Sequence, residues 1–212
     1  MLEQGLEIAK TNWKHNLMPH FLLAVLLCVS APVVMGVRNL EASQVARIVD
    51  MYLCFMGVVL FIPLFLPDAN RDIRDLIASK KLSIMTIRLI RLLQAFIVVV
   101  LLLMIFLYGL KQGKCEFPFG TFFYAALADC VAMGGLGLLF FGITDNVVIA
   151  YMMPVIYYLI SMGAGYKYLK VFWLMSLCGS GENVNADDKL YILSAGICMM
   201  AAALFIKWKR RA

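Results

Sequence analysis

Long apolar stretches separated by short clusters of charged residues dominate the chain. No Lys, Arg, Asp or Glu occurs in residues 15–37, 51–67 or 92–110. Later runs occupy residues 117–144, which only Asp129 interrupts, and residues 146–166 and 190–206. Because a spanning helix needs about 20 mostly apolar residues, or about 17 at the short limit, six runs predict six transmembrane helices. We expect these helices at residues 18–37, 48–67, 89–110, 118–142, 147–165 and 190–207.

Composition strengthens this interpretation. Hydrophobic residues make up 63% of the 212 residues and charged residues 15%, against about 45–50% and about 25% in soluble proteins. A soluble fold of this size could not hide that much apolar surface, because much of a small domain faces solvent. A soluble enzyme, a nucleic-acid-binding domain and a disordered linker are therefore excluded. We expect an all-α, polytopic membrane protein with one transmembrane domain over residues 1–212.

The Lys and Arg residues predict the orientation in the membrane. With six spans, both termini lie on the same side, and that side carries twelve of the 19 Lys and Arg residues. The side richer in Lys and Arg is normally cytoplasmic, so we expect a cell-membrane protein with both termini in the cytoplasm. Charged residues in the first 14 positions and the lack of a convincing cleavage site predict that the first span is retained.

An amphipathic segment precedes the first span, at residues 1–17. Its apolar side recurs every three or four residues, and Glu and Lys fill the other side. The apolar positions are Leu2, Leu6, Ala9, Trp13 and Leu17. This pattern favours a helix in the plane of the membrane interface over a helix packed on a soluble partner.

The loop between the second and third spans contains a second amphipathic segment, at residues 68–79. Ile73, Leu76 and Ile77 share one helical face beside charges of both signs. An apolar stripe of this kind suits docking into a groove of another protein, whereas a solvated basic loop would only set topology. The candidate docking residues are Arg71, Asp72, Ile73, Arg74, Leu76, Ile77 and Ser79. After this loop, Arg88 and Arg91 are expected to extend their side chains to the interface.

A third segment, residues 166–180, lies between the fifth and sixth spans. It is rich in aromatic residues and too short to cross a membrane. Extending the fifth span to residue 178 would bury Lys167 and Lys170 at about 2.5–3.5 kcal/mol each. The sequence therefore predicts a short external helix that is interfacial or re-entrant.

Signatures of catalysis and metal binding are missing. The chain has no P-loop, no His-Glu-x-x-His and no Gly-x-Ser-x-Gly sequence. We expect no enzyme activity, no metal site and no cofactor bound by this chain, so any ATP-driven function needs another subunit. Cys115 and Cys178 could pair in the predicted external segments, but spacing alone establishes no bridge, and unpaired thiols are favoured.

Asp129 is the acidic residue deep in a predicted span, near the bilayer midplane. Such residues are candidates for function, but a structural Asp at a helix contact is an equal alternative, with no basic residue predicted at its depth. Glycines at 134, 135, 137 and 142 predict close helix packing there. A candidate substrate path combines Asp129 with Tyr151, Met152, Tyr157 and Tyr158. Packing or lipid contact explains the Met and Tyr residues equally well.

The order of these parts resembles the membrane subunit of a type-2 ABC transporter, an ABC exporter permease. In that family an interfacial elbow helix precedes the first span, a cytoplasmic coupling helix joins spans two and three, and short external helices lie between spans five and six. Residues 1–17, 68–79 and 166–180 match these positions. The coupling segment lacks the Pro and the Glu that are common in the family.

The resemblance implies that two copies of this chain, as a homodimer, recruit two separate ABC ATPase subunits. ATP and Mg would bind in those subunits, and the cargo would be an amphipathic molecule, with a lean toward a peptide. One alternative is the substrate-binding component of an energy-coupling vitamin importer, which also has six spans; its usual Ala-x-x-x-Ala is replaced here by Ala24 and Ala31, seven apart. Another is an accessory membrane protein without a transport path.

Overall fold

The computed structural model describes residues 2–36, 38–69, 84–180 and 186–209. Its regular elements are all helices in that part of the chain. Five of them are long and apolar enough to cross a membrane: Gly5–Val34, Ala42–Phe65, Ile84–Gln112, Phe119–Thr144 and Asp188–Lys209. A sixth span results if Val147–Gly163 and Gly165–Phe172, which meet at a bend of 113°, count as one. The protein is therefore an all-helical, multi-pass membrane protein.

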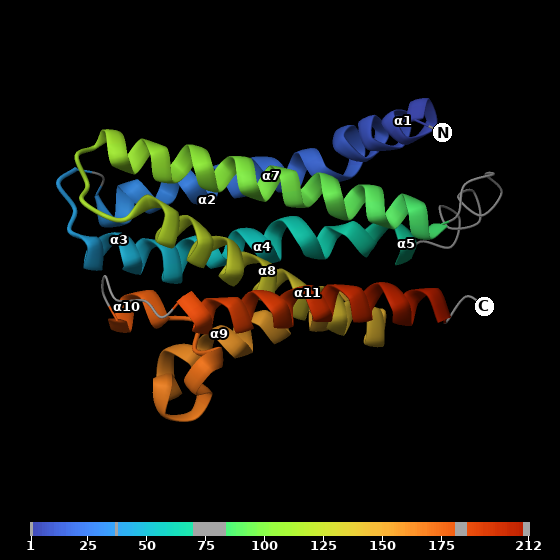
Figure 1. The fold of residues 1–212 in the computed structure, drawn as a ribbon. Coiled ribbons are helices and arrows are strands. Elements are labelled where there is room, and N and C mark those ends of the chain that lie inside the picture. The colour runs from blue at the N-terminus through green and yellow to red at the C-terminus, as the bar shows by residue number, and fades with distance from the viewer. Residues whose placement is uncertain (1, 37, 70–83, 181–185, 210–212) are drawn as a thin grey trace.

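The helices run lengthwise through one bundle with two distinct ends (Figure 1). We call the end that carries α1 (Leu2–Asn12) and the last turns of α11 (Ala186–Lys209) the terminal end. The opposite end carries the turn after α2 (Met18–Met35) and α10 (Ser176–Ser180). The helices α1 and α2 are joined by a π-helical turn, η1 (Trp13–Leu17).

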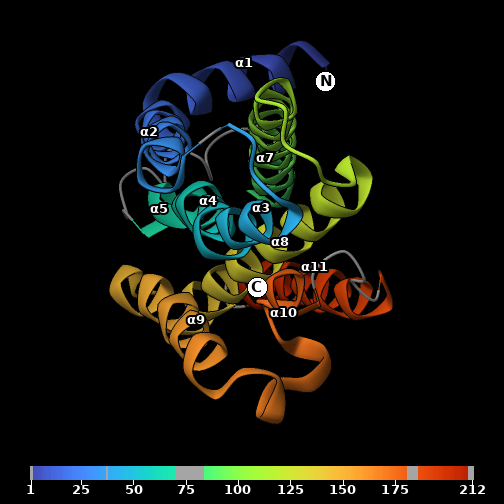
Figure 2. The same ribbon diagram turned by 90° about the vertical axis from the view of Figure 1, so that its left-hand side faces the viewer.

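Side-chain amides attach α1 to α7 (Ile84–Gln112). The Asn12 amide donates to the Gln94 carbonyl oxygen at 2.9 Å, and Gln94 donates to the backbone oxygen of Ala9 at 3.2 Å. Seen along the bundle, α1 crosses the end of α7 (Figure 2). The first helix is therefore attached to the bundle by polar contacts, whereas Leu6 and Trp13 of its predicted apolar side are exposed.

The second span is continuous but changes its helical geometry twice. A capping box between Glu41 and Gln44 starts α3 (Ala42–Ile48), because it satisfies backbone N–H groups that have no helical partner. A π-helical turn, η2 (Val49–Leu53), then leads into α4 (Cys54–Phe61). Beyond α4, the 3-10 turn η3 (Ile62–Phe65) contains Pro63, and α5 (Leu66–Ala69) follows.

The central helix is α8 (Phe119–Thr144), which lies between α4 and α11 (Figures 1 and 2). Glycines allow both neighbours to approach it closely. A Cβ atom on Gly57 of α4 would lie 2.6 Å from the carbonyl carbon of Cys130, and one on Gly196 of α11 would lie 2.8 Å from Cα of Ala132. The close packing predicted from the glycines of α8 is confirmed, since a Cβ on Gly135 would meet backbone atoms of Gly196.

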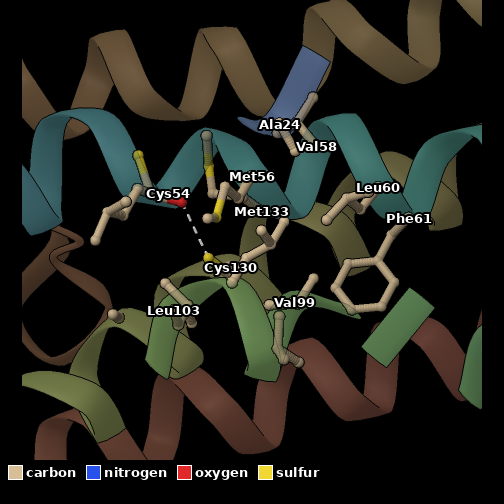
Figure 3. Packing of buried hydrophobic residues seen from close by; sticks show 14 of the residues in the cluster. Ala24, Cys54, Met56, Val58, Leu60, Phe61, Val99, Leu103, Cys130 and Met133 are labelled. Carbon is tan, nitrogen blue, oxygen red and sulfur yellow. Dashed lines mark hydrogen bonds between the residues drawn. The ribbon is translucent and has the colours of Figure 1, made fainter. Parts of the chain in front are cut away.

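A large cluster of buried apolar side chains surrounds α8 (Figure 3). Met56, Leu60 and Phe61 of α4 belong to the same cluster as Met133 of α8, and the Cys130 thiol donates to the backbone oxygen of Leu53 at 3.0 Å. Ala24 of α2 and the Val99 and Leu103 side chains of α7 also belong to this cluster.

The fifth apolar run bends before it leaves the bundle. The helix α9 (Val147–Leu169) breaks at Gly165, where φ is 56°, and the 3-10 turn η4 (Lys170–Phe172) follows it. Glycine suits this break because positive φ strains other residues. Residues 170–180, comprising η4, a turn and α10, form what we call the cap segment. It lies within the region 166–180 that the sequence predicts to be a short external helix.

The arginines that begin α7 do not reach outward as the sequence suggested. Arg88 and Arg91 are both buried. The Arg91 guanidinium donates to the backbone oxygen of Leu64 at 3.4 Å, and the Arg88 guanidinium lies 5.7 Å from the centre of the Phe65 ring. Both side chains therefore attach α7 to the end of the second span.

Candidate functional site

Three charged side chains meet inside the bundle, near its opposite end. The Lys189 ammonium donates to both carboxylate oxygens of Asp129, at 2.8 and 2.7 Å. Its distance to Oδ1 of Asp50 is 3.9 Å. All three side chains are fully buried. We call this group the buried triad.

Each member of the triad comes from a different span. Asp50 lies in the π-helical turn η2, Asp129 in the first half of α8, and Lys189 in the first turns of α11. A π-helical turn widens the helix locally and is often found at functional sites. Since the triad joins three helices that are far apart in the sequence, it fixes their relative positions.

The triad also holds the cap segment. Lys189 donates a further hydrogen bond to the backbone oxygen of Leu174 at 2.9 Å, and Oδ2 of Asp50 accepts one from the backbone N–H of Cys178 at 2.9 Å. The side chains of Leu174 and Leu177 are fully buried. The cap segment therefore covers the triad and supplies two of its hydrogen bonds.

Further polar contacts tie the cap segment to α9. The Trp173 indole donates to the backbone oxygen of Ser161 at 3.0 Å, and the Ser161 hydroxyl accepts from the N–H of Leu174 at 3.1 Å. The Tyr157 hydroxyl donates to the backbone oxygen of Phe172. These contacts satisfy backbone groups that would be costly to leave unpaired in a membrane.

The structure overturns one expectation about Asp129. Lys189 lies beside it, although the sequence placed no basic residue at that depth. Lys189 was assigned to a polar loop before a span starting at residue 190, whereas α11 starts at Ala186. The missed signal was the lone acidic residue itself, because a carboxylate buried in a membrane protein normally has a charged partner.

The predicted substrate-path residues are not all on one surface. Tyr157 and Tyr158 are partly buried: the first bonds to the cap segment, and the second donates to the backbone oxygen of Met51 at 3.5 Å. Tyr151 is partly buried against the core, whereas Met152 is 55% exposed. Of this set, only Asp129 belongs to the triad.

A second ionic contact lies at the terminal end. The Lys207 ammonium of α11 pairs with the carboxylate of Asp145, which ends α8 in the left-handed conformation. It also lies 5.0 Å from the centre of the Phe141 ring, a favourable cation–π position. Together with the triad, this contact attaches α11 to α8 near both ends of α11.

The candidate docking residues of segment 68–79 cannot be placed in the same way. Positions 70–83 lie outside the described residues, and these include Arg71, Asp72, Ile73, Arg74, Leu76, Ile77 and Ser79. The flanking residues Ala69 and Ile84 lie at the terminal end (Figure 1).

In the described residues, no group of three or more His, Cys, Asp or Glu side chains could hold a metal ion. All six cysteines lie in the described part of the chain, and none of them forms a disulfide bond there, Cys115 and Cys178 included. The chain matches no known protein family, no curated protein and no solved structure.

Proposed function

We propose that this chain is the transmembrane permease subunit of an ATP-driven ABC exporter. Two copies would pair in the cell membrane, with their termini in the cytoplasm, and two separate ATPase subunits would supply the energy. The proposed cargo is an amphipathic molecule such as a peptide.

The observation that carries this proposal is how the helices flanking residues 70–83 are attached to the bundle. The Arg91 hydrogen bond to the backbone of Leu64 joins α7 to the end of the second span. Close packing of Gly57 against Cys130 then joins that span to α8. A push on the segment between α5 and α7 would therefore be transmitted to the core helix, as an external motor requires.

The two ionic contacts between α8 and α11 extend this path. Lys189 with Asp129 and Lys207 with Asp145 join the two helices at two points. The position of the broken α9 and the cap segment, directly before the last span, also suits the family that the sequence resembles.

Substitution of the apolar face of segment 68–79 tests the proposal. We expect Leu76→Asp and Ile77→Asp to abolish association with an ATPase, because a carboxylate cannot enter an apolar groove without losing its hydration. Ala78→Asp is the matched control, since helical spacing of 100° per residue puts it on the other side. The assay is recovery of the ATPase with affinity-tagged protein from native membranes.

Normal ATPase recovery with both variants would refute docking through this segment. Recovery of one copy of the chain beside a different, large membrane subunit would instead indicate the vitamin importer. Purification of the wild-type chain without any ATPase would favour the remaining alternative, an accessory membrane protein without a transport path.

A further inference from the structure

The buried triad has an unbalanced charge. Two carboxylates and one ammonium, all fully buried, would leave one net negative charge inside a membrane protein. Burying an uncompensated charge costs several kcal/mol. We propose that the triad binds one exchangeable proton, shared between the carboxyl groups of Asp50 and Asp129, and that this proton keeps the cap segment closed. This inference does not depend on the ATPase partner.

The hydrogen bonds of the triad show where the proton belongs. An ammonium group has three N–H donors, and those of Lys189 are directed to the Asp129 carboxylate and to the backbone oxygen of Leu174. Asp50 Oδ2 accepts from Cys178, but the buried Oδ1 of Asp50 has no hydrogen-bond partner. This oxygen lies 3.9 Å from the same Lys189 ammonium that both oxygens of Asp129 bind, so the two carboxyl groups are neighbours. Two neighbouring carboxyl groups can hydrogen bond only if they share a proton.

Among the residues that the structure describes, no other nearby group balances this charge. In the described part of the chain, the charged side chains acting on Asp50 are Lys189 and Asp129. The other titratable neighbours of these two carboxyl groups carry no charge in their ordinary state; they are the thiols of Cys54 and Cys130 and the phenols of Tyr157 and Tyr158. A metal ion fits poorly because it needs several oxygen ligands, whereas the triad leaves one oxygen without a partner.

The proton is linked to the cap segment through shared contacts. The cap segment bonds to Asp50 and Lys189 and covers them with two buried leucines. Loss of the proton leaves a net charge that only water can stabilise, and water reaches it when the cap segment lifts. The closed state thus holds one more proton than the open state. By linkage, raising the pH through the titration range of the triad favours opening, by up to tenfold per pH unit.

Hydrogen–deuterium exchange of residues 170–180, in detergent or nanodiscs over a pH series, tests this link. Asp50→Asn mimics the protonated carboxyl, because its amide oxygen can accept from Cys178 and its NH₂ can donate to Asp129. Glu116→Gln is the matched control, an exposed carboxyl group near the same end. Comparing variants at equal pH cancels the intrinsic pH dependence of exchange.

We expect opening of the cap segment in the wild type and in Glu116→Gln to increase with pH by up to tenfold per unit, and to stay constant in Asp50→Asn. The same pH dependence in all three proteins would overturn the inference. So would a cap segment that is open at every pH in Asp50→Asn, because Asp50 would then be needed as an anion.

Infrared spectroscopy tests the proton without relying on cap motion. The difference spectrum between the wild type and Asp50→Asn at neutral pH should contain the C=O stretching band of a protonated carboxyl group. Asp129→Asn should also alter this band, because the proton is shared. Absence of the band from the wild type would overturn the inference.

Discussion

The close approach of α11 to α8 makes Gly196 the position where one added methyl group should be most informative. A Cβ atom there would lie 2.8 Å from Cα and N of Ala132 and 2.8 Å from the carbonyl carbon of Val131. Carbon atoms pack best at about 3.5–4.0 Å. All three neighbours are backbone atoms of a buried helix, so no side chain can turn aside, and the two helices must separate by about 1 Å.

The expected cost of Gly196→Ala follows from this separation. Adding a methyl group to a well-packed core costs about 1–3 kcal/mol, and we expect about 3 kcal/mol because the obstructing atoms are backbone. Separation would also lengthen the contacts of Lys189 with Asp129, because Lys189 lies two turns from Gly196 on α11 and Asp129 lies within one turn of Ala132 on α8.

The assay is unfolding of the detergent-solubilised protein by SDS, followed by circular dichroism. Gly109→Ala is the control, because a Cβ atom on Gly109 would meet nothing within 4 Å. We expect this control to be as stable as the wild type, or more stable by up to about 1 kcal/mol. Equal stability of Gly196→Ala and Gly109→Ala would refute the packing argument.

Two further substitutions test the triad and the cap segment. Asp129→Leu should lower the free energy of unfolding in SDS by about 3 kcal/mol, because it leaves Lys189 buried without its main partner. The double variant Asp129→Leu/Lys189→Met should recover most of this loss. A double variant as unstable as the single one would contradict this. Ser161→Ala removes the acceptor for the N–H of Leu174, so we expect exchange of residues 170–178 to accelerate by an amount corresponding to about 1–3 kcal/mol. Unchanged exchange in that segment would show that the bond does not hold it.

The apolar runs predicted the helical, membrane-spanning character of the chain well, because a membrane forces backbone polar groups into helices. The positions of charged residues were less informative about where each helix begins and ends. Lys189 was interpreted as lying just outside the last span, since charged residues usually mark the interface, and Asp50 was placed only in the first turn of the second span, at residues 48–67. In the structure the helices extend past both residues, and each is buried by a partner from another span.

The pairing itself could not be predicted from local spacing. Lys189 and Asp129 are 60 residues apart, and Lys207 and Asp145 are 62 apart. The similar offsets arise because α8 and α11 run in the same direction side by side (Figure 1). This packing is a property of the folded bundle, whereas the sequence shows only that each helix exists. The burial of Arg88 and Arg91 could not be predicted from local spacing either, because it depends on contacts with Leu64 and Phe65 at the end of the second span.

The most direct test of the proposed function is the mass of the complex that contains this chain. Native mass spectrometry of the affinity-tagged protein, purified from its own membranes in mild detergent, gives the subunits and their stoichiometry. The exporter proposal predicts an assembly of two copies of the chain with two copies of an ATPase. An assembly that contains no ATPase under conditions that preserve other membrane complexes would contradict it.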